Sequence, residues 1–87
     1  MNETQEARLK RLRMRSWRRG TKEMDLILGP FSDRHLTELS EADLLVYDQL
    51  LEENDQDLYL WVTGVGQAPV QIRDLLDRIA VLADARR

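Results

Sequence analysis

The sequence contains no cysteine, only one histidine, and no apolar run approaching the length of a membrane helix. Without cysteine there are no disulfides or thiolate metal ligands, and a single histidine leaves no multi-histidine metal site. A membrane-spanning helix needs roughly 20 apolar residues, so no insertion into a membrane is expected. The N-terminal stretch also lacks the apolar segment of a signal peptide. These absences indicate a protein of the reducing cytoplasm that binds no metal.

The length and composition indicate one soluble domain. Of the 87 residues, 43% are hydrophobic and 33% are charged, as is usual for a globular chain. A chain of this length buries one modest core. We therefore expect a single domain over residues 1–87, with frayed ends at 1–7 and 85–87.

The charges are unevenly distributed along the chain. Residues 1–22 hold eight Lys/Arg and two Asp/Glu, whereas residues 23–57 hold one Arg and eleven Asp/Glu. The first block therefore has a net charge of +6 and the second −10. Residues 58–87 contribute +1, so the whole chain has a net charge of −3. This polarity predicts either an oriented encounter with a charged partner or two solvated helix faces.

Helical periodicity and capping residues predict an all-α fold, a small five-helix bundle. The first helix is expected over residues 4–19, with Gly20 in a left-handed conformation just past its end. Thr21 is expected to cap the second helix, and Gly29-Pro30 to kink or restart it, because an interior proline costs about 3 kcal/mol.

The other three helices are marked by their first residues. Ser40 is expected to cap the third, the fourth is expected to begin near Asn54 or Asp55, and Pro69 suits the first turn of the last. The run 58–62 is apolar throughout, so a strand there stays an alternative. The last helix has the clearest predicted buried stripe: Ile72, Leu75, Leu76, Ile79, Leu82 and Ala83.

Motifs of catalysis are missing, so we expect no enzyme and no catalytic residue. Gly64-x-Gly66 is half of a dinucleotide fingerprint and is interpreted as a helix stop. Asp55-x-Asp57 lacks the glycine and the terminal glutamate of a calcium loop. His35 is the sole histidine, and its Asp-Arg-His surroundings favour a solvated side chain over a catalytic base.

A basic first helix leaves nucleic-acid binding open as an alternative function. Its cations surround Trp17 and could follow a phosphate backbone. The chain is acidic overall and has no recognised reading-helix pattern, so nucleic acid is the less favoured partner. The cations concerned are Lys10, Arg11, Arg13, Arg15, Arg18 and Arg19.

A set of ordered motifs resembles the SdhE family, the flavinylation factors of succinate dehydrogenase. The likeness covers residues 8–66, and its centre is the run Arg15-Ser16-Trp17-Arg18-Arg19-Gly20-Thr21-Lys22-Glu23-Met24-Asp25. Further segments follow in family order: Leu28 to Phe31, Leu39-Ser40, Leu50-Leu51-Glu52 and Asp55-x-Asp57-Leu58-x-x-Trp61. Gly29-Pro30 and the tail after Gly66 are less typical of the family.

The resemblance implies a five-helix fold and a role as an assembly factor of the bacterial cytoplasm. The implied partner is the flavoprotein subunit of succinate dehydrogenase, or of the related fumarate reductase, while FAD becomes covalently attached to it. A family member holds the subunit in a receptive arrangement, and the bond forms by the flavoprotein's own chemistry. No cofactor is then bound stably by this chain itself. An antitoxin-type regulatory role is the alternative that accompanies the basic helix.

By resemblance, the family motif falls on Arg19, Gly20 and Glu23. Arg19 is expected to offer its guanidinium fork to a partner, Gly20 to allow close backbone approach, and Glu23 to accept hydrogen bonds. An intramolecular Arg19–Glu23 ion pair is the alternative interpretation. Trp17 beside the motif is a candidate interface anchor. The predicted partner-binding residues are Arg15, Trp17, Arg18, Arg19, Gly20, Glu23 and Asp25.

Overall fold

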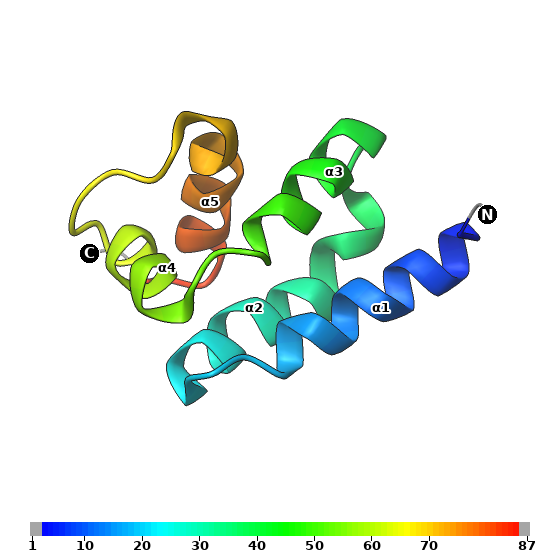
Figure 1. Cartoon of the computed structure of the whole chain (residues 1–87), viewed down its shortest axis with the longest axis horizontal. Helices are drawn as coiled ribbons and strands as arrows, with labels where there is room; N and C mark the ends of the chain where they lie inside the picture. The colour runs from blue at the N-terminus through cyan, green and yellow to red at the C-terminus, as the bar shows by residue number, and fades with distance from the viewer. Residues whose placement is uncertain (1–2, 86–87) are drawn as a thin grey trace.

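The computed structural model describes residues 3–85, which form five α-helices and one 3-10 helix without a strand. The helices are α1 (Gln5–Trp17), α2 (Lys22–His35), the 3-10 helix η1 (Leu36–Glu38), α3 (Glu41–Leu50), α4 (Asp55–Val62) and α5 (Val70–Leu82). The antiparallel pair α1 and α2 forms one side of the molecule, and α3, α4 and α5 form the other (Figure 1). The predicted all-α, five-helix fold is confirmed.

Short polar side chains begin four of these helices, as the sequence predicts. The hydroxyl of Ser40 accepts the amide of Asp43 at 3.1 Å, and the amide oxygen of Asn54 accepts that of Asp57 at 3.0 Å. Thr4 and Thr21 cap α1 and α2 in the same way. Each cap satisfies a backbone donor that has no partner within its helix. Residues 5–7, expected in a frayed end, form the first turn of α1, and residues 1–2 and 86–87 lie outside the described part.

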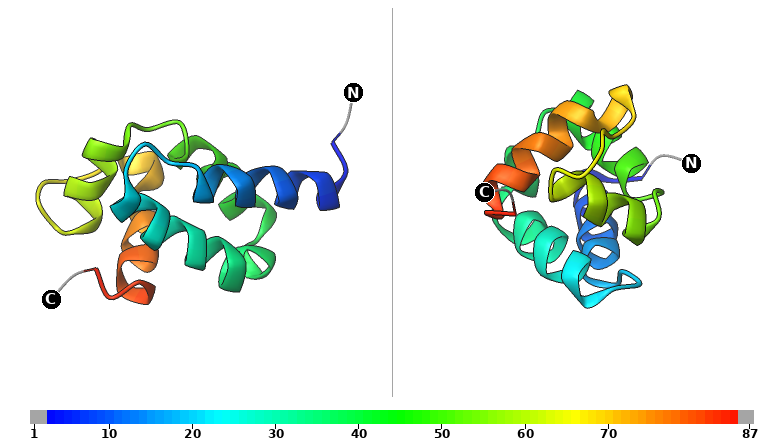
Figure 2. Two further views of the ribbon diagram at one scale, coloured as in Figure 1. Left: turned by 90° about the horizontal axis from the view of Figure 1, so that it is seen from below. Right: turned by 90° about the vertical axis from the view of Figure 1, so that its left-hand side faces the viewer.

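Apolar side chains from every helix meet between the two sides of the molecule. Leu12 of α1, Leu28 of α2 and Tyr47 of α3 are fully buried there, and the Tyr47 and Phe31 rings lie 5.6 Å apart. The last helix, α5, runs across α2 instead of along it (Figure 2). Residues 58–62 belong to α4, so the alternative of a strand is wrong.

Of the two outcomes predicted at Gly29-Pro30, a restart is wrong, because α2 continues through both residues to His35, and a kink stays a prediction. Buried contacts on both sides of the proline outweigh its local cost: Met24 and Leu28 precede it and Phe31 follows. Gly29 has a separate role. A Cβ placed on it would lie 2.4 Å from the indole of Trp17, so the glycine lets that ring rest on α2.

The buried stripe of α5 ends earlier than predicted. Ile72, Leu75, Leu76 and Ile79 are buried, but Leu82 is 53% exposed. Ala80, which was not part of the predicted stripe, is fully buried. Leu82 is the last residue of the helix and lines the rim of a hollow between α2 and the end of α5, where no further element covers it.

Candidate docking site

The connection between α1 and α2, residues 18–21, is tied to the beginning of α4; we call it the motif turn. The carboxylate of Asp55 accepts Nε of Arg19 at 2.7 Å and the backbone amide of Thr21 at 3.1 Å, and it also accepts the amide of Gly20. The amide of Arg19 donates to Asp25 Oδ1 at 2.7 Å. Segments more than 30 residues apart therefore define one compact loop.

The side chain of Arg19 points into the protein. Its Nη1 donates to the carbonyl of Leu51 and its Nη2 to that of Glu53, both at 2.8 Å. Arg19 and Asp55 each expose only 9% of their side chains. The expectation that Arg19 presents a free guanidinium to a partner is therefore wrong, because the connection between α3 and α4 already occupies its donors. The alternative pair with Glu23 is not formed either.

Gly20 lies at the surface, but its backbone is not left-handed. Only Gly64 and Gly66 among the described glycines have a positive φ, and they follow α4 as predicted. Arg18, which directly follows α1, has φ −122°, and the chain leaves the helix without a left-handed residue. The missing side chain at Gly20 instead allows Asp55 to approach the backbone closely, because a Cβ on Gly20 would lie 3.0 Å from Asp55 Oδ2.

The outer face of the motif turn and the first turn of α2 carry charged side chains that have no partner in the described part of the chain. Arg18 and Glu23 are exposed, and neither makes a hydrogen bond or ion pair within residues 3–85. Nearby, Trp17 is 40% exposed and donates to Asp33 at 3.2 Å, while Met14 is 43% exposed. The predicted site residues thus divide into an inner group, Arg15, Arg19 and Asp25, and an outer group, Trp17, Arg18, Gly20 and Glu23.

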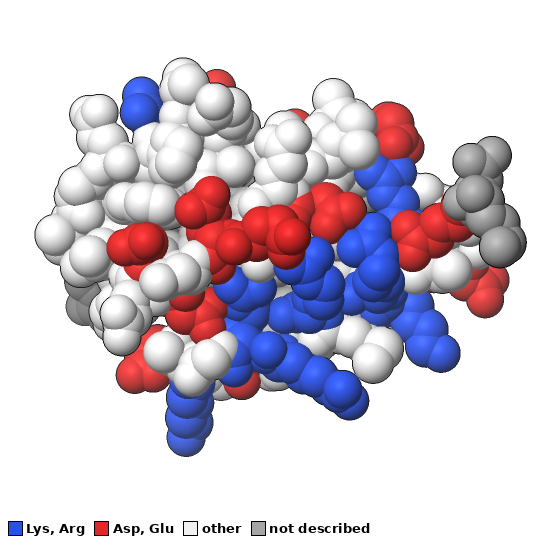
Figure 3. Space-filling view, in the orientation of Figure 1, with Lys and Arg blue, Asp and Glu red and all other residues white. Residues whose placement is uncertain are grey.

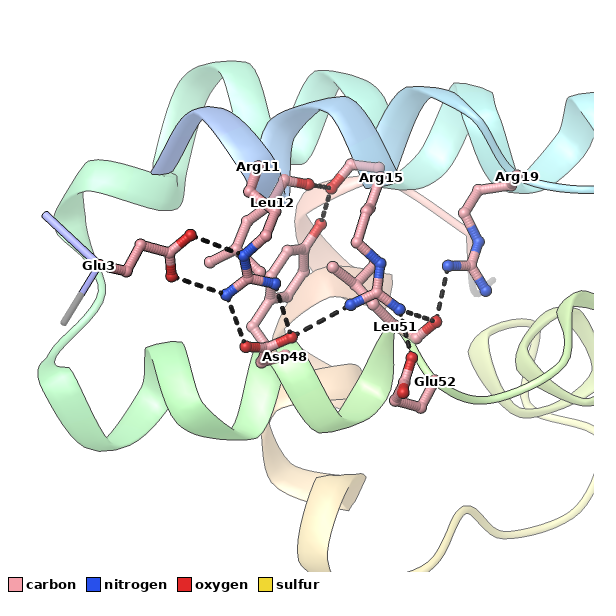
Figure 4. Close-up of polar contacts among 10 residues, drawn as sticks. Glu3, Arg11, Leu12, Arg15, Arg19, Asp48, Leu51 and Glu52 are labelled. Carbon is pink, nitrogen blue, oxygen red and sulfur yellow. Dashed lines mark hydrogen bonds and ion pairs between the residues drawn. The ribbon is translucent and has the colours of Figure 1, made fainter. Parts of the chain in front are cut away.

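Four arginines, three at successive turns of α1 and one in the motif turn, pair with acidic groups of α3, of the connection that follows it and of α4; we call this the arginine seam. Figure 4 shows three of them, Arg11, Arg15 and Arg19. Arg11 bonds Asp48 and Glu3, each at 2.9 Å. Arg15 bonds Asp48 at 3.1 Å and Glu52 at 2.5 Å. Arg8 pairs with Glu41 at 2.6 Å, and Arg19 with Asp55 completes the seam.

The hydrogen bonds of the arginine seam shift the pKa values of several of its members. Hydrogen bonds from Arg11 hold the pKa of Asp48 below its usual value and do the same to the pKa of Glu3. The same bonds, that to Asp48 first, raise the pKa of Arg11. On the surface, a band of acidic groups borders the basic groups of α1 (Figure 3). The positive and negative blocks of the sequence therefore largely neutralise each other within one molecule.

This neutralisation weakens the case for nucleic-acid binding. Of the six cations in the basic stretch, Arg11, Arg15 and Arg19 serve the seam, and Arg13 lies 3.5 Å from Asp33. Only Lys10 and Arg18 are left with no partner within residues 3–85. Two separated cations provide little of the phosphate contact on which such binding depends.

A buried hydroxyl pair lies beneath the seam. Ser16 donates to the carbonyl of Leu12 at 2.8 Å, so the Tyr47 hydroxyl, 2.5 Å away, donates to Ser16. Both residues are fully buried. Burial disfavours the phenolate and raises the pKa of Tyr47 to about 12.

The stability of the protein is expected to fall in alkaline solution because of Tyr47. Its pKa is about 12 in the fold against 10.0 for an ordinary tyrosine, so the contribution is complete below about pH 10 and is lost as the pH rises through 12. The loss amounts to about 3 kcal/mol. Urea unfolding of wild type and Tyr47→Phe across this range measures it, since the other titrating groups are common to both. Equal pH dependence in the two proteins would contradict the expectation.

Two acidic residues with a defined place in the site, Asp48 and Asp55, were not predicted to take part in it. Asp55 appeared only in a rejected calcium-loop pattern and within the family segments, and Asp48 not at all. The available signal was the charge polarity, because a block of +6 followed by one of −10 can pair within the chain. Spacing alone could not match individual arginines to individual carboxylates.

Other kinds of site are not found in the described part of the chain. No group of three or more His, Asp or Glu side chains within residues 3–85 is arranged to hold a metal ion. None of the helices there combines the length and apolar character that crossing a bilayer requires. His35 contacts Glu38 at 3.0 Å on the surface and packs beside Phe31.

Fold and site together define a class: a small all-helical domain in which paired charges hold a glycine turn at the surface. The family model described as "flavinator of succinate dehydrogenase" matches residues 10–83. The chain belongs to this family, as the sequence motifs predicted.

Curated relatives are similar over most of the chain. A mitochondrial succinate dehydrogenase assembly factor 2 of Meyerozyma guilliermondii is 48% identical over 61 residues, covering 70% of this chain and 45% of the relative. The corresponding protein of Scheffersomyces stipitis is 46% identical over 61 residues (70% and 41%), and that of Drosophila grimshawi 39% over 72 residues (80% and 49%). The chain thus spans less than half the length of these relatives.

Proposed function

We propose that this protein is an assembly factor that binds the flavoprotein subunit of succinate dehydrogenase and promotes covalent attachment of FAD. Family membership and the printed role of the relatives support the proposal. The observation that carries it in the structure is the outer face of the motif turn. There Gly20 and the unpaired Arg18 and Glu23 lie exposed beside Trp17, on a loop fixed from behind by Asp55.

The proposed role is to bind and hold, not to react. The subunit would meet a preformed loop, so little conformational entropy would be lost on docking. Glu23 would accept hydrogen bonds from the partner's cations or amides, and Trp17 would supply apolar contact. The flavin would stay with the partner, and the covalent bond would form by the partner's own groups.

Two finer points belong to the same proposal. The fumarate reductase flavoprotein is a second candidate partner, and binding of each purified subunit would rank the two. We place the protein in the bacterial cytoplasm on the basis of its cysteine-free composition and the family resemblance. The curated relatives named above are mitochondrial by name, so cell fractionation is the test of the compartment.

Glu23→Lys is expected to reduce flavoprotein binding roughly 10- to 100-fold, because a lost charge-assisted hydrogen bond is worth about 1.5–3 kcal/mol. The Glu23 side chain has no partner among the described residues, so stability should change little. Co-expression with the flavoprotein subunit, followed by covalent flavin fluorescence in a denaturing gel, measures the effect.

Glu6→Lys is the matched control, since Glu6 is an exposed, unpaired acid in the first turn of α1 as Glu23 is in that of α2. Both variants lose a similar favourable interaction with a helix N-terminus. Normal flavinylation with Glu23→Lys would exclude this residue from the interface. Normal flavinylation in cells that lack the protein altogether would reject the proposed function.

A further inference from the structure

Asp55 is the group that shapes the motif turn from behind. Its Oδ1 accepts Arg19 Nε at 2.7 Å, while its Oδ2 accepts two consecutive backbone amides, those of Gly20 and Thr21. A carboxylate that receives three donors from one short segment fixes both the side chain and the peptide planes of that segment. With 9% of its side chain exposed, Asp55 itself offers almost no surface to another molecule.

The same oxygen explains why residue 20 has no side chain. A Cβ on Gly20 would lie 3.0 Å from Asp55 Oδ2, closer than carbon and oxygen normally approach, and the backbone there is not left-handed. The neighbour cannot yield easily, because Oδ2 holds two amides and Oδ1 is held by Arg19. Close approach of an internal carboxylate is thus sufficient reason for a glycine.

We infer that Asp55 is a positioning residue of the docking site, and that Gly20 is required by Asp55 and not by direct contact with the partner's backbone. The identity of the partner in this inference is taken from the proposed function. Arg19 belongs to the same device, since it ties the turn to the carbonyls of Leu51 and Glu53. Asp55 then controls the affinity for the flavoprotein without touching it.

A double-mutant cycle of Gly20→Ala and Asp55→Ala separates the two explanations for the glycine. The dissociation constant of the purified flavoprotein subunit is measured for wild type, both single variants and the double variant, well below their melting temperatures. Each single substitution is expected to weaken binding about tenfold or more. Gly20→Ala should add no further loss once Asp55 is alanine, because sites in contact are not additive. An equal loss in both backgrounds would show that the partner itself excludes the side chain, and would overturn the inference.

The positioning is also measured without any partner. In NMR spectra of the free protein, Asp55→Ala should shift the amide resonances of Gly20 and Thr21 and speed their hydrogen exchange. Asp57→Ala is the matched control: it lies in the same helical turn, is exposed, and its carboxylate has no partner in the described chain. If the two amides respond equally to both variants, Asp55 does not shape the turn and the inference fails.

Asp55→Asn keeps the experiment decisive if the alanine variant does not fold. The amide retains the shape but must turn its NH2 group toward either Arg19 or the backbone amides, so one set of bonds is lost. It should weaken binding and disturb the amides of Gly20 and Thr21, whereas Asp57→Asn should do neither. Failure of the wild type to bind the subunit would reject the proposed function and the docking role of Asp55 together. The NMR shifts and hydrogen exchange of the Gly20 and Thr21 amides would then still show whether Asp55 fixes Gly20. Non-additive effects of Gly20→Ala and Asp55→Ala on the free energy of unfolding would test the same point.

Discussion

Arg19→Met lowers the free energy of unfolding by about 3–5 kcal/mol, as expected for loss of one partner from a buried ion pair. Methionine fills much of the volume but removes the charged partner of Asp55 and the donor to the carbonyl of Glu53. The Leu51 carbonyl keeps only its bond from Arg15, and Asp55 keeps only the backbone amides of Gly20 and Thr21. A domain of this size has only about 5–15 kcal/mol of stability in total, so the variant is close to unfolding. Urea denaturation followed by circular dichroism measures the change.

Arg18→Met is the matched control, because Arg18 is the adjacent arginine, is exposed and has no partner within residues 3–85. A surface substitution of this kind alters stability by no more than about 0.5 kcal/mol. Similar losses in the two variants would contradict the inward orientation of Arg19. A large loss of flavoprotein binding in the Arg18 variant alone would instead assign the partner contact to this exposed neighbour.

Gly20→Arg is expected to weaken binding of the flavoprotein subunit about 100-fold or more, which corresponds to about 3 kcal/mol. A Cβ on Gly20 already crowds Asp55 Oδ2, so we expect the longer side chain to turn away from Asp55, onto the proposed docking surface. The unfolding free energy should fall by only about 1–3 kcal/mol, typical of added bulk in a packed place. Co-purification with the subunit and thermal melting measure the two effects separately.

Thr37→Arg provides the control for the added charge, since Thr37 is an exposed residue of η1 with no side-chain partner in the described chain. It introduces the same side chain at a position away from the turn and should leave binding unchanged. If Gly20→Arg supports normal flavinylation while folding normally, the motif turn is not the docking site.

Local signals predicted the helices well. Ser40 and Asn54 begin α3 and α4 as their side-chain chemistry requires, because each has an oxygen within reach of an otherwise unpaired amide. The paired glycines after α4 both adopt a positive φ, as a helix stop often does. Such features depend on a few neighbouring residues, and for that reason the sequence alone reveals them.

Tertiary contacts explain where those predictions fail. The proline in α2 is tolerated because Leu28 and Phe31 anchor the helix on both sides of it, and Gly29 accommodates Trp17, a residue of another helix. Leu82 has the right spacing for the core but is 53% exposed, because no helix of the described chain covers it. Periodicity indicates which face of a helix is apolar, but the neighbouring elements decide how far that face is buried.

The sequence indicated which residues form the motif turn, but not the groups that hold this turn from behind. Arg19 and Gly20 lie in one surface turn, as the motif implies, yet the groups that hold them come from the connection between α3 and α4. Asp55 is 36 residues from Arg19, and nothing in local spacing distinguishes it from the ten other acids of the acidic block. Pairing across that separation became visible only with the fold.

The link between the motif turn and Asp55 has a consequence for newly made protein. During synthesis the turn emerges early, but it lacks its supporting carboxylate until residue 55 and the helix that carries it have followed. A chain that ends before residue 55 therefore contains the residues of the motif turn but lacks the carboxylate that fixes their conformation. On the proposed function, the flavoprotein would therefore bind tightly only after residue 55 and α4 have taken their places behind the turn.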